Sequence, residues 1–189
     1  MADLLLRTHP LESWSAAFAE LPDTVRITPE PFVTMIDVRV DAAAGTAVRG
    51  TPLPTTPNTW TPTDDGRLVW LGPDEWLLTS TDVAPEALET ELRDQLRPAG
   101  GTAVDVSAQR IGLRISGSAA RAVLAKGCSI DLHPRVFRPG SSAQTTLGLA
   151  AVVLLALGPD DFAVLVRSSF AGYLATWLLD ASLEYAPLG

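Results

Sequence analysis

The sequence predicts an α+β fold, in which antiparallel sheets carry helices packed on them. The prediction depends on period-two strand patterns, on helical apolar stripes and on a hairpin that occurs twice. Leu71-Gly72-Pro73-Asp74-Glu75-Trp76 and Leu157-Gly158-Pro159-Asp160-Asp161-Phe162 match in residue type at every position, and their glycines are 86 residues apart. Each motif follows an apolar strand and precedes a strand and an amphipathic helix. The pattern therefore predicts two copies of a strand-turn-strand-helix unit. The alternative is a chance match, because leucine, Gly-Pro-Asp turns and aromatic residues are common.

In the first half, Pro10 and the helically spaced apolar residues after it predict a short amphipathic helix. Period-two alternation over residues 34–40 predicts a strand with one exposed face, which carries Met35, Asp37 and Arg39. Residues 41–66 are rich in Ala, Gly, Thr and Pro and predict an extended loop. Residues 84–97 predict a helix with an apolar stripe formed by Leu88, Leu92 and Leu96.

The second half begins with a short strand at residues 104–106 and an alternating strand at residues 111–115. Ser116 and Ser118 are placed to cap a short helix that ends at Gly127. Residues 128–142 are irregular, and the second hairpin follows. The last element is a helix whose predicted stripe contains Phe170, Tyr173, Leu174, Trp177, Leu178 and Ala181.

Composition indicates one folded domain over residues 1–189, made of two pseudo-repeats at about 30–100 and 101–189. The 189 residues are 47% hydrophobic and 19% charged, which is enough apolar surface for a sizeable core and excludes wholesale disorder. The net charge of -8 argues against a nucleic-acid partner.

Nothing in the sequence suggests a membrane protein or a secreted one. The longest apolar run, residues 147–157, is much shorter than the roughly 20 residues that cross a bilayer. Residues 1–7 have no basic region followed by a long apolar stretch, so no secretion signal is expected. We expect a cytoplasmic protein.

The common catalytic and nucleotide-binding motifs are missing. There is no G-x-G-x-x-G, no phosphate-binding loop and no G-x-S-x-G. Cys128 and His133 are five residues apart, but we favour a buried thiol beside a loop histidine over a thiolate pair. The acidic pairs at 64–65, 74–75 and 160–161 lie in predicted turns or loops, where Asp is common for conformational reasons. We expect no catalytic, cofactor-binding or metal-binding residue in this chain.

Two groups of residues are candidates for contact with a partner protein. Trp70 and Trp76 flank the first tight turn, where one or both are expected to stay partly exposed, as aromatic residues do at interfaces. Arg135 and Arg138 flank Val136 and Phe137 within the irregular segment.

This arginine-flanked segment, together with His133, predicts a docking loop for another chain, in particular an acidic one. The alternative is a well-packed surface connection.

Four separated blocks resemble the gamma subunit family of heterotetrameric sarcosine oxidase. The resemblance covers most of the chain after about residue 30. Its residues are Thr51-Pro-Leu-Pro-Thr-Thr-Pro-Asn58, Val69-Trp-Leu-Gly-Pro-Asp-Glu-Trp-Leu-Leu78, Leu124-Ala-Lys-Gly-Cys-Ser-Ile-Asp-Leu-His-Pro134 with Phe137 and Pro139-Gly140, and Arg167-Ser-Ser-Phe170.

This resemblance implies a bacterial complex of alpha, beta, gamma and delta subunits. Such a complex demethylates sarcosine oxidatively to glycine, passes the electrons to oxygen to give hydrogen peroxide, and yields formaldehyde or 5,10-methylenetetrahydrofolate. FAD, FMN, NAD, tetrahydrofolate and zinc are expected in the other subunits. The gamma chain is similar to the folate-binding domain of the glycine-cleavage aminomethyltransferase, which is itself built of duplicated α+β units.

Three functions remain open from the sequence. The first is a noncatalytic subunit that assembles or stabilises the oxidase. The second is an autonomous folate-binding or aminomethyl-transferring module. The third is a thiol enzyme that uses Cys128. The resemblance carries no catalytic residue over to this sequence, and the first function is therefore the main hypothesis.

Overall fold

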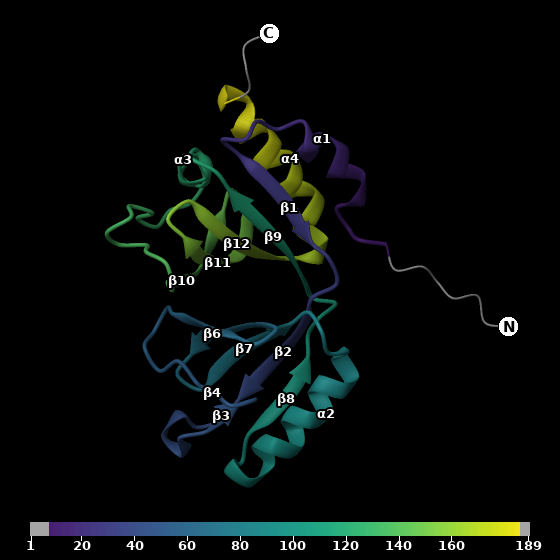
Figure 1. Cartoon of the computed structure of the whole chain (residues 1–189), viewed down its shortest axis with the longest axis vertical. Coiled ribbons are helices and arrows are strands. Elements are labelled where there is room, and N and C mark those ends of the chain that lie inside the picture. Colours follow the sequence, from purple (N-terminus) through teal and green to yellow (C-terminus); the bar gives the residue numbers. More distant parts are fainter. Residues whose placement is uncertain (1–7, 186–189) are drawn as a thin grey trace, which may run out of the picture.

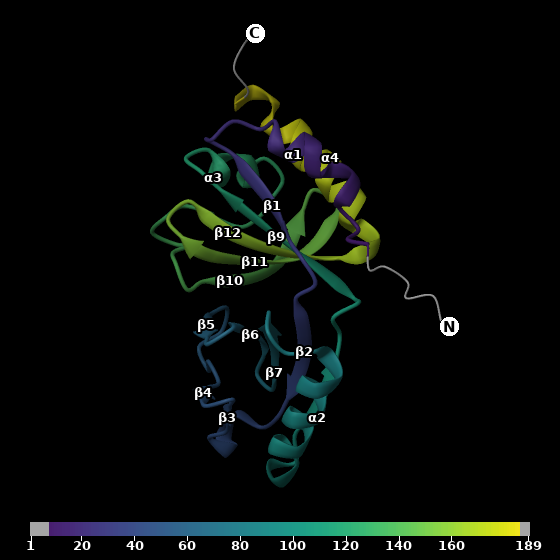
Figure 2. The same cartoon turned by 45° about the vertical axis from the view of Figure 1, so that its right-hand side comes forward.

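The computed structural model describes residues 8–185, and residues 1–7, where no secretion signal was expected, lie outside this range. Two five-stranded antiparallel sheets form the centre of the molecule, and helices cover their outer faces (Figure 1). Figure 2 shows the two sheets one above the other along the long axis, with α2 on the lower sheet and α1, α3 and α4 on the upper one. The predicted α+β fold with antiparallel sheets and packed helices is confirmed.

The lower sheet has the strand order β5-β6-β7-β2-β8. Helix α2 packs on it through Leu88, Leu92 and Leu96, all fully buried, as the apolar stripe predicts. The bounds are β2 (Thr34–Arg39), β5 (Trp60–Thr63), β6 (Gly66–Gly72), β7 (Glu75–Ser80), α2 (Pro85–Leu96) and β8 (Thr102–Asp105), with a separate small hairpin of β3 (Ala47–Val48) and β4 (Thr51–Pro52).

The upper sheet has the strand order β1-β9-β12-β11-β10. Its helices bury Phe18 of α1, Leu124 of α3 and Leu174 and Leu178 of α4 in one hydrophobic cluster. The bounds are α1 (Ser15–Ala19), β1 (Arg26–Glu30), β9 (Arg110–Ser116), α3 (Ala120–Ala125), β10 (Ser142–Leu147), β11 (Ala150–Gly158), β12 (Asp161–Arg167) and α4 (Ala171–Ser182). Short 3-10 helices occupy Glu12–Trp14, Ala42–Ala44, Arg97–Ala99, Ser168–Phe170 and Leu183–Tyr185.

The two predicted hairpins have the same register and the same irregularity. Trp70 pairs with Trp76 and Gly72 with Glu75 across β6 and β7. Adding 86 to each number gives the pairs Ala156 with Phe162 and Gly158 with Asp161 across β11 and β12. Helices α2 and α4, of 12 residues each, are separated by the same 86 positions. Residues 66–96 and 152–182 therefore correspond without insertion or deletion.

Each sheet is completed by a strand that lies after its helix or at the start of the chain. After α2 the chain returns as β8 and pairs with β2 at the edge of the lower sheet. After α4 no further strand follows in the described residues, and β1 pairs with β9 in the corresponding position. The chain consequently passes between the sheets twice, from β1 to β2 and from β8 to β9.

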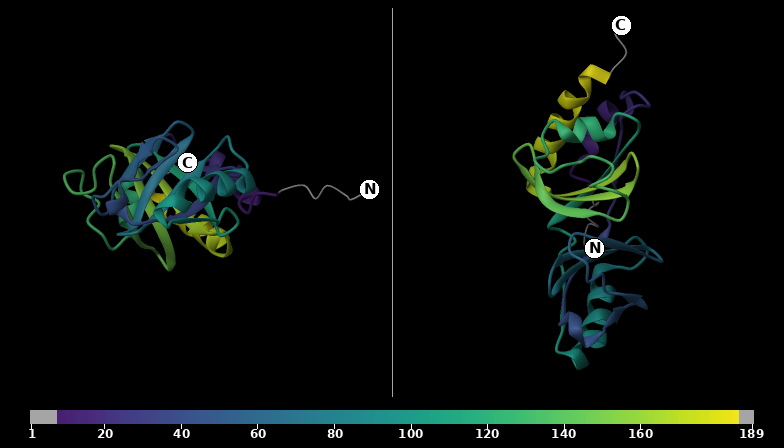
Figure 3. Two further views of the ribbon diagram at one scale, coloured as in Figure 1. Left: turned by 90° about the horizontal axis from the view of Figure 1, so that it is seen from below. Right: turned by 90° about the vertical axis from the view of Figure 1, so that its left-hand side faces the viewer.

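A separate hydrophobic cluster fills the space between the two sheets, which face each other as the side view in Figure 3 shows. It contains Met35, Val69, Leu71, Leu77, Val153, Leu155, Ala163 and Leu165. The prediction that Met35 lies on the exposed face of its strand is therefore wrong. The lower sheet is covered on both faces, by α2 on one face and by the upper sheet on the other.

Other details differ from the sequence-based expectations. The loop predicted at 41–66 contains the short strands β3, β4 and β5, and β10 was not predicted. No serine side chain caps α3, whose N-cap residue is Ala119. In the predicted stripe of α4, Leu174, Leu178 and Ala181 are buried, whereas Phe170 and Tyr173 are exposed large hydrophobic residues.

Candidate functional site

Two irregular loops from different halves of the chain lie side by side and form a surface groove. Thr59 and Ser141 form an isolated antiparallel bridge. The Trp60 amide donates to Gly140 O at 3.0 Å, and the Ser142 amide donates to Asn58 O at 2.8 Å. The groove has a volume of about 820 Å³ and is lined by residues 54–61, 130–131 and 136–143. Both loops carry blocks on which the family resemblance depends.

The six predicted partner-contact residues fall into two classes. Trp76 is fully buried, and its indole N–H donates to Pro54 O at 2.8 Å. Phe137 is also buried, with its ring stacked 6.4 Å from that of Phe162. Neither side chain offers surface to a partner, because Trp76 packs in the core of the lower sheet and Phe137 in the core of the upper sheet. Trp70 is half-buried against the lower core.

The other three candidates are exposed and lie on one segment, residues 131–140, which we name the basic loop. His133, Arg135 and Arg138 are all exposed. Asp131 Oδ1 accepts from the His133 amide at 2.8 Å, and His133 Nδ1 accepts from the Arg135 amide at 3.2 Å. Local hydrogen bonds therefore shape the loop without using the charges of its arginines.

Sequence reasoning missed the side chain that fastens the basic loop to the upper sheet. Arg121 of α3 donates from Nη1 to Leu132 O and to Phe137 O, and from Nη2 to Pro159 O. Its guanidinium carbon lies 4.9 Å from the centre of the Phe162 ring. Since its hydrogen-bond acceptors are main-chain carbonyls, no residue type in the sequence marks them as its partners.

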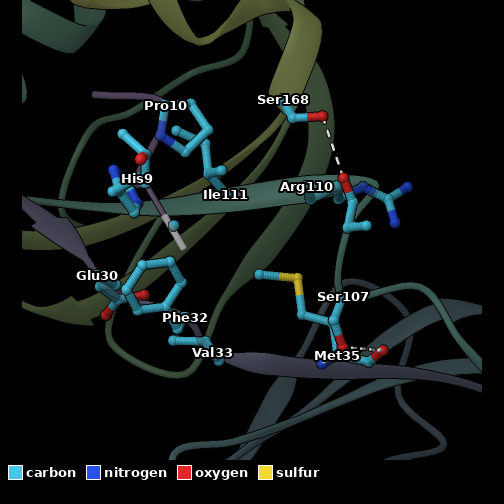
Figure 4. Close-up of a pocket in the computed structure, with 13 residues that line it drawn as sticks. His9, Pro10, Glu30, Phe32, Val33, Met35, Ser107, Arg110, Ile111 and Ser168 are labelled. Atoms are coloured by element: carbon cyan, nitrogen blue, oxygen red, sulfur yellow. Dashed lines mark hydrogen bonds between the residues drawn. The ribbon is translucent and has the colours of Figure 1, made fainter. Parts of the chain in front are cut away.

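A small cavity lies where the chain passes between the sheets (Figure 4). It measures about 230 Å³, and its walls include His9, Glu30, Phe32, Met35 and Ser107. His9 Nδ1 accepts from the Leu11 amide at 3.1 Å, while the buried Nε2 has no hydrogen-bond partner within residues 8–185. The cavity is smaller than the roughly 300–1,000 Å³ typical of small-molecule sites.

Charged groups lie beside this crossing. Burial raises the pKa of Asp37 from its ordinary value, although Arg39 and Arg110 act in the opposite direction. Burial also lowers the pKa of Arg110, and the positive charge of Arg167 adds to that effect. Strands β2 and β9 thus place the carboxyl group of Asp37 and the guanidinium of Arg110 near each other, and both groups are partly removed from water.

The remaining sequence candidates have structural contacts. Cys128 is half-buried, and its Sγ lies 3.9 Å from Thr145 Oγ1. The predicted turn carboxylates form ion pairs, such as Asp161 with Arg114 and Glu75 with Arg39. Between residues 8 and 185, no group of three His, Cys, Asp or Glu side chains is placed to hold a metal ion. No helix in this part of the chain is long and apolar enough to cross a membrane.

Comparisons with known proteins agree over nearly the whole chain. The model of the "Sarcosine oxidase, gamma subunit family" matches residues 36–184. The sequence is 37% identical over 191 residues to sarcosine oxidase subunit gamma from Corynebacterium sp. (strain P-1), covering 96% of this chain and 92% of that protein. The corresponding protein from an Arthrobacter species gives the same identity and coverage.

Solved structures show the same relationship. A chain of the heterotetrameric sarcosine oxidase from Corynebacterium sp. U-96, in complex with pyrrole 2-carboxylate, superposes with a TM-score of 0.87 and 32% identity, covering 97% of this chain and 98% of that one. Aminomethyltransferase T of the glycine cleavage system from Bartonella henselae gives a TM-score of 0.65 at 15% identity, covering 87% of this chain and 48% of that one. The second likeness shows a shared fold.

Proposed function

The chain belongs to the sarcosine oxidase gamma subunit family, and we propose that it is the gamma subunit of a heterotetrameric sarcosine oxidase, in which it assembles or stabilises the complex. Its partners are the alpha, beta and delta subunits, and neither nucleic acid nor membrane is among its ligands. FAD, FMN, NAD, tetrahydrofolate and zinc belong to the other subunits. The complex converts sarcosine to glycine with hydrogen peroxide and formaldehyde or 5,10-methylenetetrahydrofolate, in the cytoplasm.

The basic loop is the observation that carries the assembly role. Its Val136 is 59% exposed between neighbours that include the exposed Arg135 and Arg138. An exposed apolar side chain flanked by arginines is typical of a contact surface. We propose His133, Arg135 and Arg138 of this loop as contact residues, together with the half-buried Trp70 beside the first hairpin turn. A stable interface would bury at least about 1,000 Å² in total.

We further propose that residues 1–189 form a single domain of two pseudo-repeats, at about 30–100 and 101–189. The constant separation of 86 positions between the hairpins and between α2 and α4 supports this division. The cluster between the sheets supports a single domain, because Val69 and Leu77 of one repeat pack with Val153 and Leu165 of the other. Strand β8 pairs in the sheet of the first repeat although it lies after residue 101.

Reconstitution of the oxidase with and without this chain tests the assembly role. Alpha, beta and delta subunits would be co-expressed with the full chain or without it, and the products compared by size-exclusion chromatography, thermal midpoint and sarcosine turnover. We expect the preparation without the chain to lose the complete assembly and to have a lower midpoint. Full turnover with an unchanged midpoint in its absence would contradict the proposal.

The folate-binding alternative depends on the fold alone. Of the two hollows described above, the cavity at the crossing, at about 230 Å³, is too small for a ligand of folate size, and only the surface groove, at about 820 Å³, has the volume for one. We derive no step through such a ligand. Calorimetry of the isolated chain with tetrahydrofolate separates the two functions: micromolar binding would favour the folate module, and no heat would favour assembly. Full activity of the complex after Cys128→Ser would contradict the hypothesis that the chain is a thiol enzyme.

A further inference from the structure

The basic loop has no helix or strand of its own. Local hydrogen bonds give it a turn, in which the Val136 and Phe137 amides donate to His133 O, and two side chains fasten this turn to the upper sheet. Phe137 inserts into the upper core and stacks on Phe162. Arg121 reaches the loop at two points, Leu132 O and Phe137 O, and also the β11–β12 turn at Pro159 O. One guanidinium thus joins both ends of the exposed part of the loop to the sheet.

The environment of Arg121 indicates that its role is geometric. Among the described residues, its guanidinium donates to three main-chain carbonyl oxygens, and its Nε has no partner. A planar guanidinium with five N–H donors can hold carbonyls that point from different directions, whereas a lysine ammonium is a compact point charge on a flexible stem. Loss of Arg121 would leave three main-chain carbonyls without this donor.

The loop held in this way presents unpaired positive charge. Within residues 8–185, ion pairs involve Arg26, Arg39, Arg49, Arg67, Arg93, Arg97, Arg114 and Lys126. In the same part of the chain, no ion pair is found for Arg135 or Arg138. Their neighbour Asp131 is hydrogen-bonded to the His133 amide. In a chain with a net charge of -8, this loop is a local site where a negative group is attracted.

We propose that Arg121 is a positioning residue that presets the basic loop as the binding surface for an acidic, carboxylate-bearing segment of a partner subunit of the oxidase. This inference rests on the proposed function. A preset loop loses less conformational entropy on binding than a mobile one, which strengthens association. Carboxylates of the partner meet Arg135 and Arg138 in charge-assisted hydrogen bonds.

Hydrogen exchange of the isolated full chain tests the positioning step without any partner. We expect Arg121→Met to speed amide exchange in residues 131–140 by about tenfold, as the loss of a charged hydrogen-bond donor implies. We expect Arg121→Lys to give an intermediate effect, which keeps the test valid if the Met variant does not fold. Arg114→Met is the control, because its ion pair with Asp161 lies next to the same turn. Unchanged exchange of the loop in both Arg121 variants would overturn the positioning role.

Association with co-expressed alpha, beta and delta subunits tests whether the basic loop binds an acidic segment of a partner subunit. We expect the double variant Arg135→Gln/Arg138→Gln to keep the exchange pattern of the loop, to associate about tenfold more weakly and to lose part of the dependence of affinity on salt. Arg97→Gln, which breaks an exposed ion pair elsewhere, is the control. Association of the double variant equal to that of the wild type would overturn the acidic contact. If the wild-type chain failed to associate, the proposed function would fail instead, while the exchange experiment would still decide the role of Arg121.

Discussion

The guanidinium of Arg67 and the carboxylate of Glu30 form a two-pronged ion pair that links the two sheets. Nη2 of Arg67 lies 2.8 Å from Oε1 of Glu30, and Nη1 lies 3.2 Å from Oε2. Glu30 ends β1 of the upper sheet, and Arg67 lies on β6 of the lower one. The side chains are 17% and 22% exposed, so water screens the pair only in part. The pair therefore adds a polar link to the apolar cluster between the sheets.

Removing one partner of this pair is expected to destabilise the chain. Arg67→Met leaves the Glu30 carboxylate partly desolvated without its cation, and we expect the free energy of unfolding to fall by about 1–3 kcal/mol. Urea unfolding measures the change. Arg97→Met is the control: its ion pair with Asp94 is highly exposed, and we expect a loss below about 1 kcal/mol. Equal losses in the two variants would show that the Arg67–Glu30 pair contributes no more than a surface pair.

The Asp65 carboxylate should make stability depend on pH. It accepts hydrogen bonds from Ser80 and Arg49, and Ser80 Oγ accepts from the Val83 amide just before α2. Burial alone would raise the pKa of Asp65, but the hydrogen bonds and the charge of Arg49 outweigh it and lower the pKa. The ionised form therefore stabilises the fold above the pKa of the unfolded chain, and this stabilisation is lost as the pH falls through the folded pKa.

We expect Asp65→Asn to lower the free energy of unfolding at pH 7 by about 1–3 kcal/mol, since it removes a charged acceptor. The difference from the wild type should begin to shrink below about pH 4, where the carboxyl of the unfolded chain takes up a proton, and it should vanish only below the lowered pKa of the folded chain. Thermal midpoints from pH 7 to pH 3 measure both. A difference that stays constant over this range would mean that the charge of Asp65 is unimportant.

The elements that were predicted well have local signals. The turn Gly72-Pro73-Asp74-Glu75 and the leucine stripe of α2 depend on residues close in sequence, and both are present. The pairing of strands that are far apart in the chain has weaker signals in the sequence. Nothing in the sequence of β1 indicates that it would join β9, across about 80 residues. Met35 is buried because the upper sheet packs on its strand, and the residue pattern of that strand cannot indicate a second sheet.

The same distinction applies to the candidate site. The irregular character of residues 128–142 and the exposure of Arg135 and Arg138 were predicted from local composition. The burial of Trp76 and Phe137 was not, because it depends on Pro54 O and on Phe162, which lie elsewhere in the chain.

Gly66 is a position where the backbone, and not a turn conformation, requires glycine. A Cβ atom there would lie 1.9 Å from the carbonyl oxygen of Thr79 on the neighbouring strand. We expect Gly66→Ala to force β6 and β7 apart and to lower the free energy of unfolding by about 1–3 kcal/mol, as overpacking does. Gly72→Ala on the same strand is the control, because its Cβ would meet the nearest atom at an ordinary 3.4 Å. Thermal melts compare the two, and similar midpoints would argue against the clash.

Met35 tests whether the two sheets are held together by the apolar cluster between them. Its side chain is 1% exposed and packs in that cluster on the face of β2 opposite α2. Met35→Ala would leave a void next to the cavity at the crossing, and we expect a loss of about 2–5 kcal/mol in the free energy of unfolding. Met35→Leu keeps most of the volume, so its loss should stay below about 1.5 kcal/mol. Leu149→Ala is the control because Leu149 is 80% exposed. If urea unfolding gave Met35→Ala the same small loss as Leu149→Ala, the residues around Met35 would have to close the void at no cost, and the contact between the sheets would not be the close-packed core described above.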